Sequence, residues 1–146
     1  MQQRPIEVLI VEDNEADSHL TTTALRDARI ANDVHVVEDG EEAIAFLNQE
    51  GTYKSAPRPD LILLDLNLPK KDGFQVLEEM RADAHLRNIP VIVVSGSDRA
   101  ADITRAYDLQ IAGYLVKPVD VDDYFSAIRA LKELWFHVVT PPPSAG

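Results

Sequence analysis

The chain has 146 residues, of which 45% are hydrophobic and none is cysteine, and its formal net charge is −11. This length is typical of a single domain with its own hydrophobic core, and the lack of cysteine excludes disulfides and thiolate metal sites. The negative charge disfavours nucleic acid and anionic membrane surfaces as partners, because binding to both depends on basic residues.

Five short apolar runs alternate with five segments of helical periodicity. The predicted strands are 7–11, 33–37, 60–64, 90–94 and 113–116, and the predicted helices are 15–28, 40–49, 73–82, 99–109 and 121–136. Strict alternation predicts an α/β fold of the (βα)5 type, in which helices cover both faces of a five-stranded parallel sheet. We expect a loop at 48–60, one domain over residues 1–138 and a disordered tail at 139–146.

The composition of the runs indicates which strands are central. Runs 7–11, 60–64 and 90–94 are almost entirely apolar, as expected of strands that are buried on both faces. Run 33–37 contains a histidine and run 113–116 is short, so these two are expected at the edges. This division matches, by analogy, the doubly wound, flavodoxin-like strand order 2-1-3-4-5.

Carboxylates follow two of the predicted central strands. Glu12 and Asp13 follow the first strand, and Asp65 ends the third. In the order 2-1-3-4-5 these ends are neighbours at the point where the strand order reverses, which is where ligands bind in such sheets. Three close carboxylates repel one another, so at least one would take a proton unless a cation lies among them, and an all-oxygen ligand set favours Mg²⁺. As alternatives, Asp13 or Asn14 could cap the first helix, and Glu12 could be a solvated charge.

Ser95 and Lys117 end the fourth and fifth predicted strands and should therefore lie at the same edge. The lysine could neutralise an anionic group bound to Asp65, and the serine could donate a hydrogen bond to it. Each could by itself be an ordinary loop residue. Together with three carboxylates at four strand ends, they indicate phosphate chemistry.

These residues resemble the receiver domain of two-component response regulators. The resemblance extends from Val8 to about Phe136. It rests on Glu12-Asp13, on Asp65 with Pro69 and Gly73 in the spacing D-x-x-x-P-x-x-x-G, on Ser95 and on Lys117-Pro118. The long loop at 48–60 and the stretch DLNLPKKDG resemble single-domain receivers associated with bacterial phytochrome kinases. Serine and glutamate stand where the family often has threonine and aspartate, and both keep the required groups.

The resemblance implies a signalling protein and not an enzyme. Asp65 would accept a phosphoryl group from a phosphohistidine of a sensor histidine kinase, with Lys117 paired to that group. Asp13 and Asp65 would bind Mg²⁺ directly. Glu12 would bind it through water, and Asn67 through its backbone carbonyl.

The resemblance also implies how the signal is transmitted. Ser95 would move towards the phosphoryl group, and Tyr114 would turn into the space that it leaves. The surface of the fourth helix, fifth strand and fifth helix would then change for protein partners. The peptide bond before Pro118 would be cis, and the kinase would contact the first helix and the loop after Lys117. As an alternative, Tyr114 could serve only in packing.

The last predicted helix is a candidate interaction surface. Its apolar positions cover more than half of its circumference, with Trp135 and Phe136 at its end, so we expect a homodimer or docking surface unless the tail covers it. No run is long enough to span a membrane and no signal peptide precedes the first strand, so we expect a cytoplasmic protein.

Three other functions remain open. One is a receiver that acts as a scaffold without phosphorylation. A haloacid-dehalogenase-like phosphatase would need a second acid two positions after its nucleophile, where this chain has Asn67. An FMN-binding flavodoxin would need a first loop that holds a phosphate, which the acidic stretch EDNEAD would repel.

Overall fold

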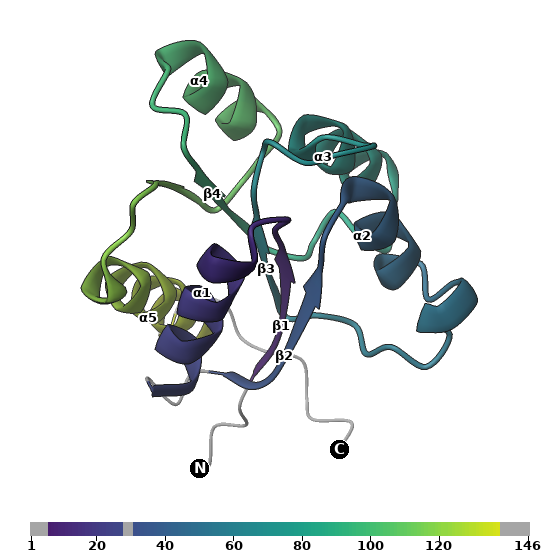
Figure 1. Ribbon diagram of the computed structural model, residues 1–146, viewed down its shortest axis with the longest axis horizontal. Helices are drawn as coiled ribbons and strands as arrows, with labels where there is room; N and C mark the ends of the chain where they lie inside the picture. The colour runs from purple at the N-terminus through teal and green to yellow at the C-terminus, as the bar shows by residue number, and fades with distance from the viewer. Residues whose placement is uncertain (1–5, 28–30, 138–146) are drawn as a thin grey trace.

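The computed structural model describes residues 6–27 and 31–137, and the predicted tail at 139–146 lies outside them (Figure 1). Within this part the strands are β1 (Ile6–Val11), β2 (Ala31–Val37), β3 (Leu61–Leu64), β4 (Val91–Ser95) and β5 (Gly113–Val116). The α-helices are α1 (Glu15–Asp27), α2 (Gly40–Leu47), α3 (Gly73–Ala82), α4 (Ala100–Asp108) and α5 (Val121–His137). The predicted strand–helix alternation is confirmed.

The five strands form one parallel sheet in the order β2-β1-β3-β4-β5. The predicted flavodoxin-like order is therefore confirmed, including the edge positions of β2 and β5. In the pairing of β1 with β3, Val11 lies opposite Leu64. The two strands consequently end at the same level, and the residues that follow them begin side by side.

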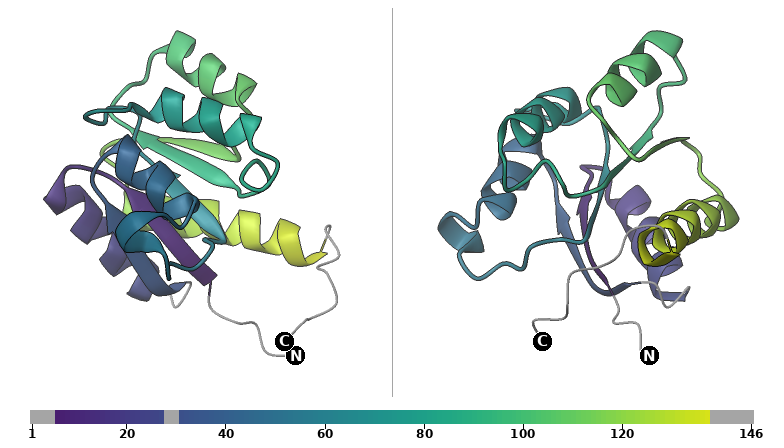
Figure 2. Two further views of the ribbon diagram at one scale, coloured as in Figure 1. Left: turned by 90° about the vertical axis from the view of Figure 1, so that its right-hand side faces the viewer. Right: turned by 180° about the vertical axis from the view of Figure 1, so that it is seen from behind.

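Helices cover both faces of the sheet, as Figure 2 shows: α1 and α5 lie on one face, and α2, α3 and α4 on the other. Side chains along β1 alternate between the two hydrophobic cores. Val8 and Ile10 belong to the core under α1 and α5, whereas Leu9 and Val11 belong to the core under the other three helices. This two-sided burial is the reason that the central runs are apolar at nearly every position.

The predicted loop at 48–60 is partly structured, because it contains a 3₁₀ turn, η1 (Gly51–Tyr53). The ring of Tyr53 packs on Phe46, with 5.3 Å between the centroids, and its hydroxyl donates to Glu42 Oε1 at 2.8 Å. The helix predicted over 40–49 ends at Leu47, because Gln49 adopts a positive φ of 55°, which a helix cannot accommodate.

The other predicted boundaries agree with the structure to within one residue, except that β2 begins at Ala31, two residues before the predicted start at residue 33. The segment predicted as 99–109 is helical over 100–108, with Arg99 as its N-cap. The last helix is confirmed, but the side chains of Trp135 and Phe136 lie outside the described part, so the predicted interaction surface is not tested. None of the helices described is both long and apolar enough to cross a membrane.

Candidate functional site

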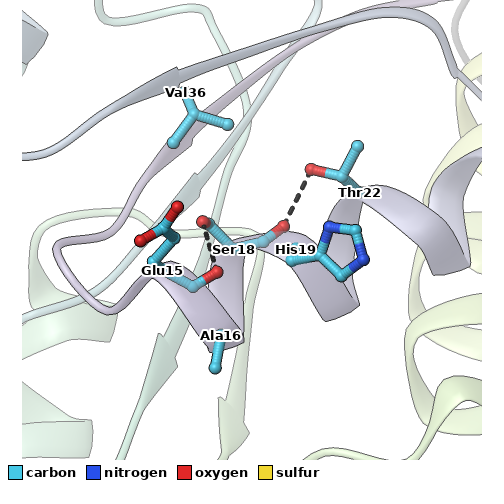
Figure 3. A pocket seen from close by; sticks show the side chains of 6 residues that line it. All are labelled: Glu15, Ala16, Ser18, His19, Thr22 and Val36. Atoms are coloured by element: carbon cyan, nitrogen blue, oxygen red, sulfur yellow. Dashed lines mark hydrogen bonds between the residues drawn. The ribbon is translucent and has the colours of Figure 1, made fainter.

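A hollow of about 550 Å³ lies on the outer side of α1, beside the edge strand β2 (Figure 3). It is lined by Glu15, Ala16, Ser18, His19, Thr22 and Val36. Its hydroxyl groups bond within their own helix: Ser18 donates to the carbonyl of Glu15 at 3.1 Å, and Thr22 donates to the carbonyl of Ser18 at 2.8 Å. The two hydroxyl groups of the hollow are therefore already paired within α1.

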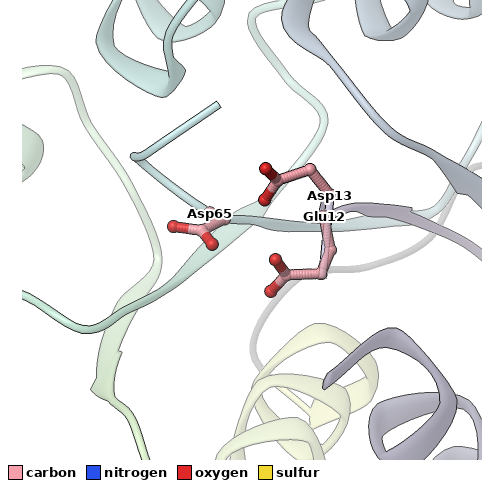
Figure 4. Close-up of side chains that lie close together, drawn as sticks. All are labelled: Glu12, Asp13 and Asp65. Carbon is pink, nitrogen blue, oxygen red and sulfur yellow. The ribbon is translucent and has the colours of Figure 1, made fainter. Parts of the chain in front are cut away.

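A second candidate is an acidic pocket at the carboxyl ends of β1 and β3 (Figure 4). Glu12, Asp13 and Asp65 each place one carboxylate oxygen within 4.8 Å of the others. Glu12 and Asp65 are each only 6% exposed, whereas Asp13 is exposed. The predicted convergence of the three acids is confirmed, and Asp13 forms the open side of the pocket.

The backbone extends the strand pairing into this pocket and orients two of the carboxylates. The amide of Asp65 donates to the carbonyl of Val11 at 3.0 Å, so the residue after β3 remains paired with β1. Asp65 Oδ1 accepts the backbone N–H of Asn67 at 3.0 Å, and Glu12 Oε2 accepts the backbone N–H of Asn14 at 3.1 Å. One oxygen of each buried carboxylate is thus held by the backbone two residues later.

Lys117 contacts both buried carboxylates of the pocket. Its Nζ donates to Glu12 Oε1 at 2.5 Å, to Asp65 Oδ2 at 2.9 Å and to Asp17 Oδ2 at 2.9 Å. Burial by itself would lower the pKa of Lys117, but these three hydrogen bonds outweigh it and raise the pKa above its usual range. The ammonium is therefore charged at neutral pH. The peptide bond between Lys117 and Pro118 is cis, as predicted.

Glu12 is the carboxyl group that the pocket perturbs most clearly. Burial raises its pKa from 4.5 to about 7, although the hydrogen bonds from Lys117 and from the Asn14 amide act in the opposite direction. The nearby charge of Asp65 raises the pKa further. Glu12 therefore tends to hold its proton mainly because it is buried, and the nearby carboxylate of Asp65 acts in the same direction.

Asp17 was not singled out from the sequence, yet it is one of the three partners of Lys117. It lies in the first turn of α1, and no spacing in the sequence indicated that it would meet Lys117. Asn14 caps α1, because its Oδ1 accepts the backbone N–H of Asp17 at 3.0 Å. Of the two capping alternatives, Asn14 is the cap, whereas the carboxylate of Asp13 belongs to the acidic pocket.

Ser95 lies at the predicted edge but not in contact with the acids. It is fully buried, and its Oγ accepts the backbone N–H of Ser97 at 3.2 Å. Among the described residues, no hydrogen bond joins Ser95 to the three carboxylates. Tyr114 is half-buried, and its hydroxyl donates to the carbonyl of Ser97 at 2.9 Å. Both residues therefore meet at Ser97, which was not predicted.

The loop after Asp65 turns back towards the strand end. The amide of Gly73 donates to the carbonyl of Leu66 at 3.0 Å. Asp72 and Gln75 form a capping box at the start of α3: Asp72 Oδ1 accepts the amide of Gln75 and Gln75 Oε1 accepts that of Asp72, each at 2.9 Å. The spacing between Asp65 and Gly73 thus sets where the turn closes and α3 begins.

The donor set of the acidic pocket fits a hard divalent cation. Three carboxylates contribute only oxygen atoms, and no cysteine exists in the chain. Such ligands suit Mg²⁺ and Mn²⁺ better than the softer metals that nitrogen and sulfur ligands select. The exposure of Asp13 leaves room for water molecules, which Mg²⁺ usually retains in its coordination shell.

Comparison with known proteins gives a consistent result. The family described as the response regulator receiver domain matches residues 8–129. Response regulator Rcp1 of Synechocystis sp. is 41% identical over 138 residues, which cover 94% of each chain. The crystal structure of the phosphorylated cyanobacterial phytochrome response regulator RcpA has a TM-score of 0.80 and 44% identity, and the match covers 96% of this chain and 100% of that one. The crystal structure of the Mn²⁺-bound form of Rcp1 has a TM-score of 0.79 and 41% identity. The match covers 95% of this chain and 100% of that one.

Proposed function

This chain belongs to the response regulator receiver domain family, and on that premise we propose that it is a phosphorylation switch whose phosphoryl acceptor is Asp65. The observation that carries the proposal is the position of Asp65: its carboxylate lies within the cluster of three acids and contacts the Lys117 ammonium at 2.9 Å. An aspartate at such a point can act as a nucleophile towards phosphorus, while a fixed cation balances the charge of the incoming group.

The proposed reaction is the transfer of a phosphoryl group from a phosphohistidine of a sensor histidine kinase. A carboxylate oxygen of Asp65 forms a bond to phosphorus, the phosphorus–nitrogen bond breaks, and the electron pair returns to the imidazole. Lys117 already donates to Asp65 Oδ2, so it is placed to pair with the oxygens of the new phosphoryl group. In this role the chain is a signalling protein and not an enzyme. The only reactions that it would promote are its own phosphorylation and dephosphorylation.

Mg²⁺ is the cofactor that the pocket would hold. Asp13 and Asp65 would bind it directly, Glu12 through water and Asn67 through its backbone carbonyl. When bound, the ion offsets the negative charge that develops on the phosphoryl oxygens. The similar Rcp1 in its Mn²⁺-bound form supports a divalent cation in this family.

The proposed kinase is of the phytochrome type. Support comes from the relatives, because the similar structures include a cyanobacterial phytochrome response regulator and the bacteriophytochrome response regulator AtBRR, which is 38% identical. With 25 acidic against 14 basic residues, the chain favours a protein partner over nucleic acid.

Signal output is proposed to run through Ser95 and Tyr114 to the surface formed by α4, β5 and α5. Phosphorylation adds negative charge and acceptor oxygens beside Asp65, which would attract the Ser95 hydroxyl. That hydroxyl currently accepts from Ser97, whose carbonyl also accepts from Tyr114. A movement of Ser95 would therefore disturb the segment that positions Tyr114.

Incubation with Mg²⁺ and acetyl phosphate tests this function. We expect a phosphoryl adduct on the intact chain that is lost in Asp65→Asn and that hydrolyses in both acid and base. Absence of an adduct, together with unchanged partner binding, would favour the scaffold alternative. Steady release of phosphate from generic monoesters would favour a phosphatase.

A further inference from the structure

We propose that Asp17 is a positioning residue that holds the Lys117 ammonium at the phosphoryl-accepting carboxylate; this rests on the function proposed above. An ammonium group has three N–H donors. In this structure Glu12, Asp65 and Asp17 accept one each, at 2.5, 2.9 and 2.9 Å. These acceptors come from three different parts of the fold: the end of β1, the end of β3 and the first turn of α1.

Asp17 differs from the other two acceptors in that it does not belong to the cluster of candidate metal ligands. In the proposed reaction, Glu12 and Asp65 would engage the cation and the phosphoryl group. Asp17 would then be the acceptor that remains with Lys117 throughout. Asp17 can keep the Lys117 ammonium in place while the ammonium exchanges its hydrogen bonds to Glu12 and Asp65 for bonds to the phosphoryl oxygens.

The backbone around Asp17 is fixed well enough for this task. Its N–H donates to the Asn14 cap at 3.0 Å, and its carbonyl accepts from the Thr21 hydroxyl at 3.0 Å. A carboxylate in the first turn of a helix is also stabilised by the positive end of the helix dipole. Lys117, by contrast, ends a flexible four-carbon chain and depends on its partners for a defined position.

Two effects of removing Asp17 have opposite signs, which makes the proposal testable. If Asp17 positions Lys117, its loss leaves the ammonium less often aligned with the phosphoryl group, and phosphorylation slows. If Asp17 contributes only negative charge, its loss makes the pocket more attractive to an anionic phosphodonor, and phosphorylation accelerates.

The experiment compares Asp17→Ala, Asp17→Asn and a matched control, Glu15→Gln. Glu15 is the other acidic residue in the first turn of α1; it is exposed and is not one of the three acceptors of Lys117. Its variant therefore shows how much of the effect comes from losing one negative charge near the start of this helix. With Mg²⁺ and phosphoramidate, we expect Asp17→Ala to be phosphorylated roughly tenfold more slowly than the wild type. Asp17→Asn should be slowed less, because an amide oxygen still accepts the hydrogen bond. Glu15→Gln should match the wild type.

A second measurement reports the positioning directly. The order parameter of the Lys117 ammonium, from ¹⁵N relaxation of the protein without phosphodonor, should fall in Asp17→Ala, fall less in Asp17→Asn and stay unchanged in Glu15→Gln. Faster or unchanged phosphorylation of Asp17→Ala, or an equally ordered ammonium, would overturn the proposal. If the wild type itself accepts no phosphoryl group, the proposed function fails, and the ammonium measurement still decides whether Asp17 positions Lys117.

Discussion

Gly73 lies directly against the backbone of Asp65. A Cβ atom at position 73 would be 2.6 Å from the Asp65 carbonyl oxygen and 2.7 Å from the Cα of Leu66, closer than Cβ atoms approach backbone in folded proteins. The start of α3 can therefore pack onto the strand end only because residue 73 has no side chain. This contact gives a physical reason for the spacing between the aspartate and the glycine.

Replacing Gly73 by alanine should destabilise the protein and displace the acceptor. Because both contacted atoms belong to the backbone, the loop after β3 must shift, and we expect a loss of roughly 1–3 kcal/mol in the free energy of unfolding. Urea denaturation measures it. Gly96→Ala is the matched control, since a Cβ at that exposed position meets nothing within 4 Å. Equal stability of the two variants would contradict the packing argument.

The acidic pocket could be predicted from the sequence because few facts about the fold were needed. Parallel strands place their carboxyl ends at one edge, and a central strand is recognisable by its apolar run. Asp65 and Glu12 follow two such runs directly, so their proximity depends only on strand order. The same reasoning placed Lys117 and Ser95 at this edge.

The parts that were missed depend on side-chain direction and loop geometry. Asp17 lies in a helix, and no strand periodicity indicates which lysine it meets. The meeting of Ser95 and Tyr114 at Ser97 depends on the path of the loop after β4. The ends of helices were predicted less accurately than the centres of strands. Helix α2 ends at Leu47, two residues before the predicted end, because Gln49 adopts a positive φ.

Mg²⁺ should stabilise the folded protein, and Asp13 should be needed for this. A ligand at one hundred times its dissociation constant adds about 2.7 kcal/mol to the free energy of unfolding. Thermal unfolding with and without Mg²⁺ measures this gain, which Asp13→Asn should largely abolish because it removes one of the three carboxylates. Asp33→Asn, an exposed acid at the opposite end of the sheet, should retain it. A full gain in Asp13→Asn would exclude this residue as a ligand.

Stability without metal should depend on pH through Glu12. The unfolded carboxyl loses its proton near pH 4.5, whereas the folded one keeps it up to about pH 7. Between these values the folded state binds the extra proton, so the contribution of Glu12 to stability falls as the pH rises. Relative to Glu12→Gln, which cannot ionise, the wild type should lose roughly 1–3 kcal/mol from pH 4.5 to pH 7.5.

Urea denaturation of both proteins in the presence of EDTA measures this difference. A wild type that gains stability over Glu12→Gln across the same pH window would show that the carboxylate is charged and that its ion pair with Lys117 outweighs burial. Divalent cations compete with the proton on Glu12. The apparent affinity for Mg²⁺ should therefore rise as the pH increases through 7.

Tyr124 joins the last helix to the first. Its hydroxyl lies 2.9 Å from that of Thr21, and the tyrosine is only 5% exposed. Tyr124→Phe keeps the ring but removes this hydrogen bond, so we expect a loss of about 1 kcal/mol in the free energy of unfolding. Tyr107→Phe, at a position in α4 that is 49% exposed, is the control and should change stability little. Because Thr21 also donates to the carbonyl of Asp17, phosphorylation of Tyr124→Phe should proceed at close to the wild-type rate. A large loss of rate without a loss of stability would instead indicate that the contact between α1 and α5 controls Asp17.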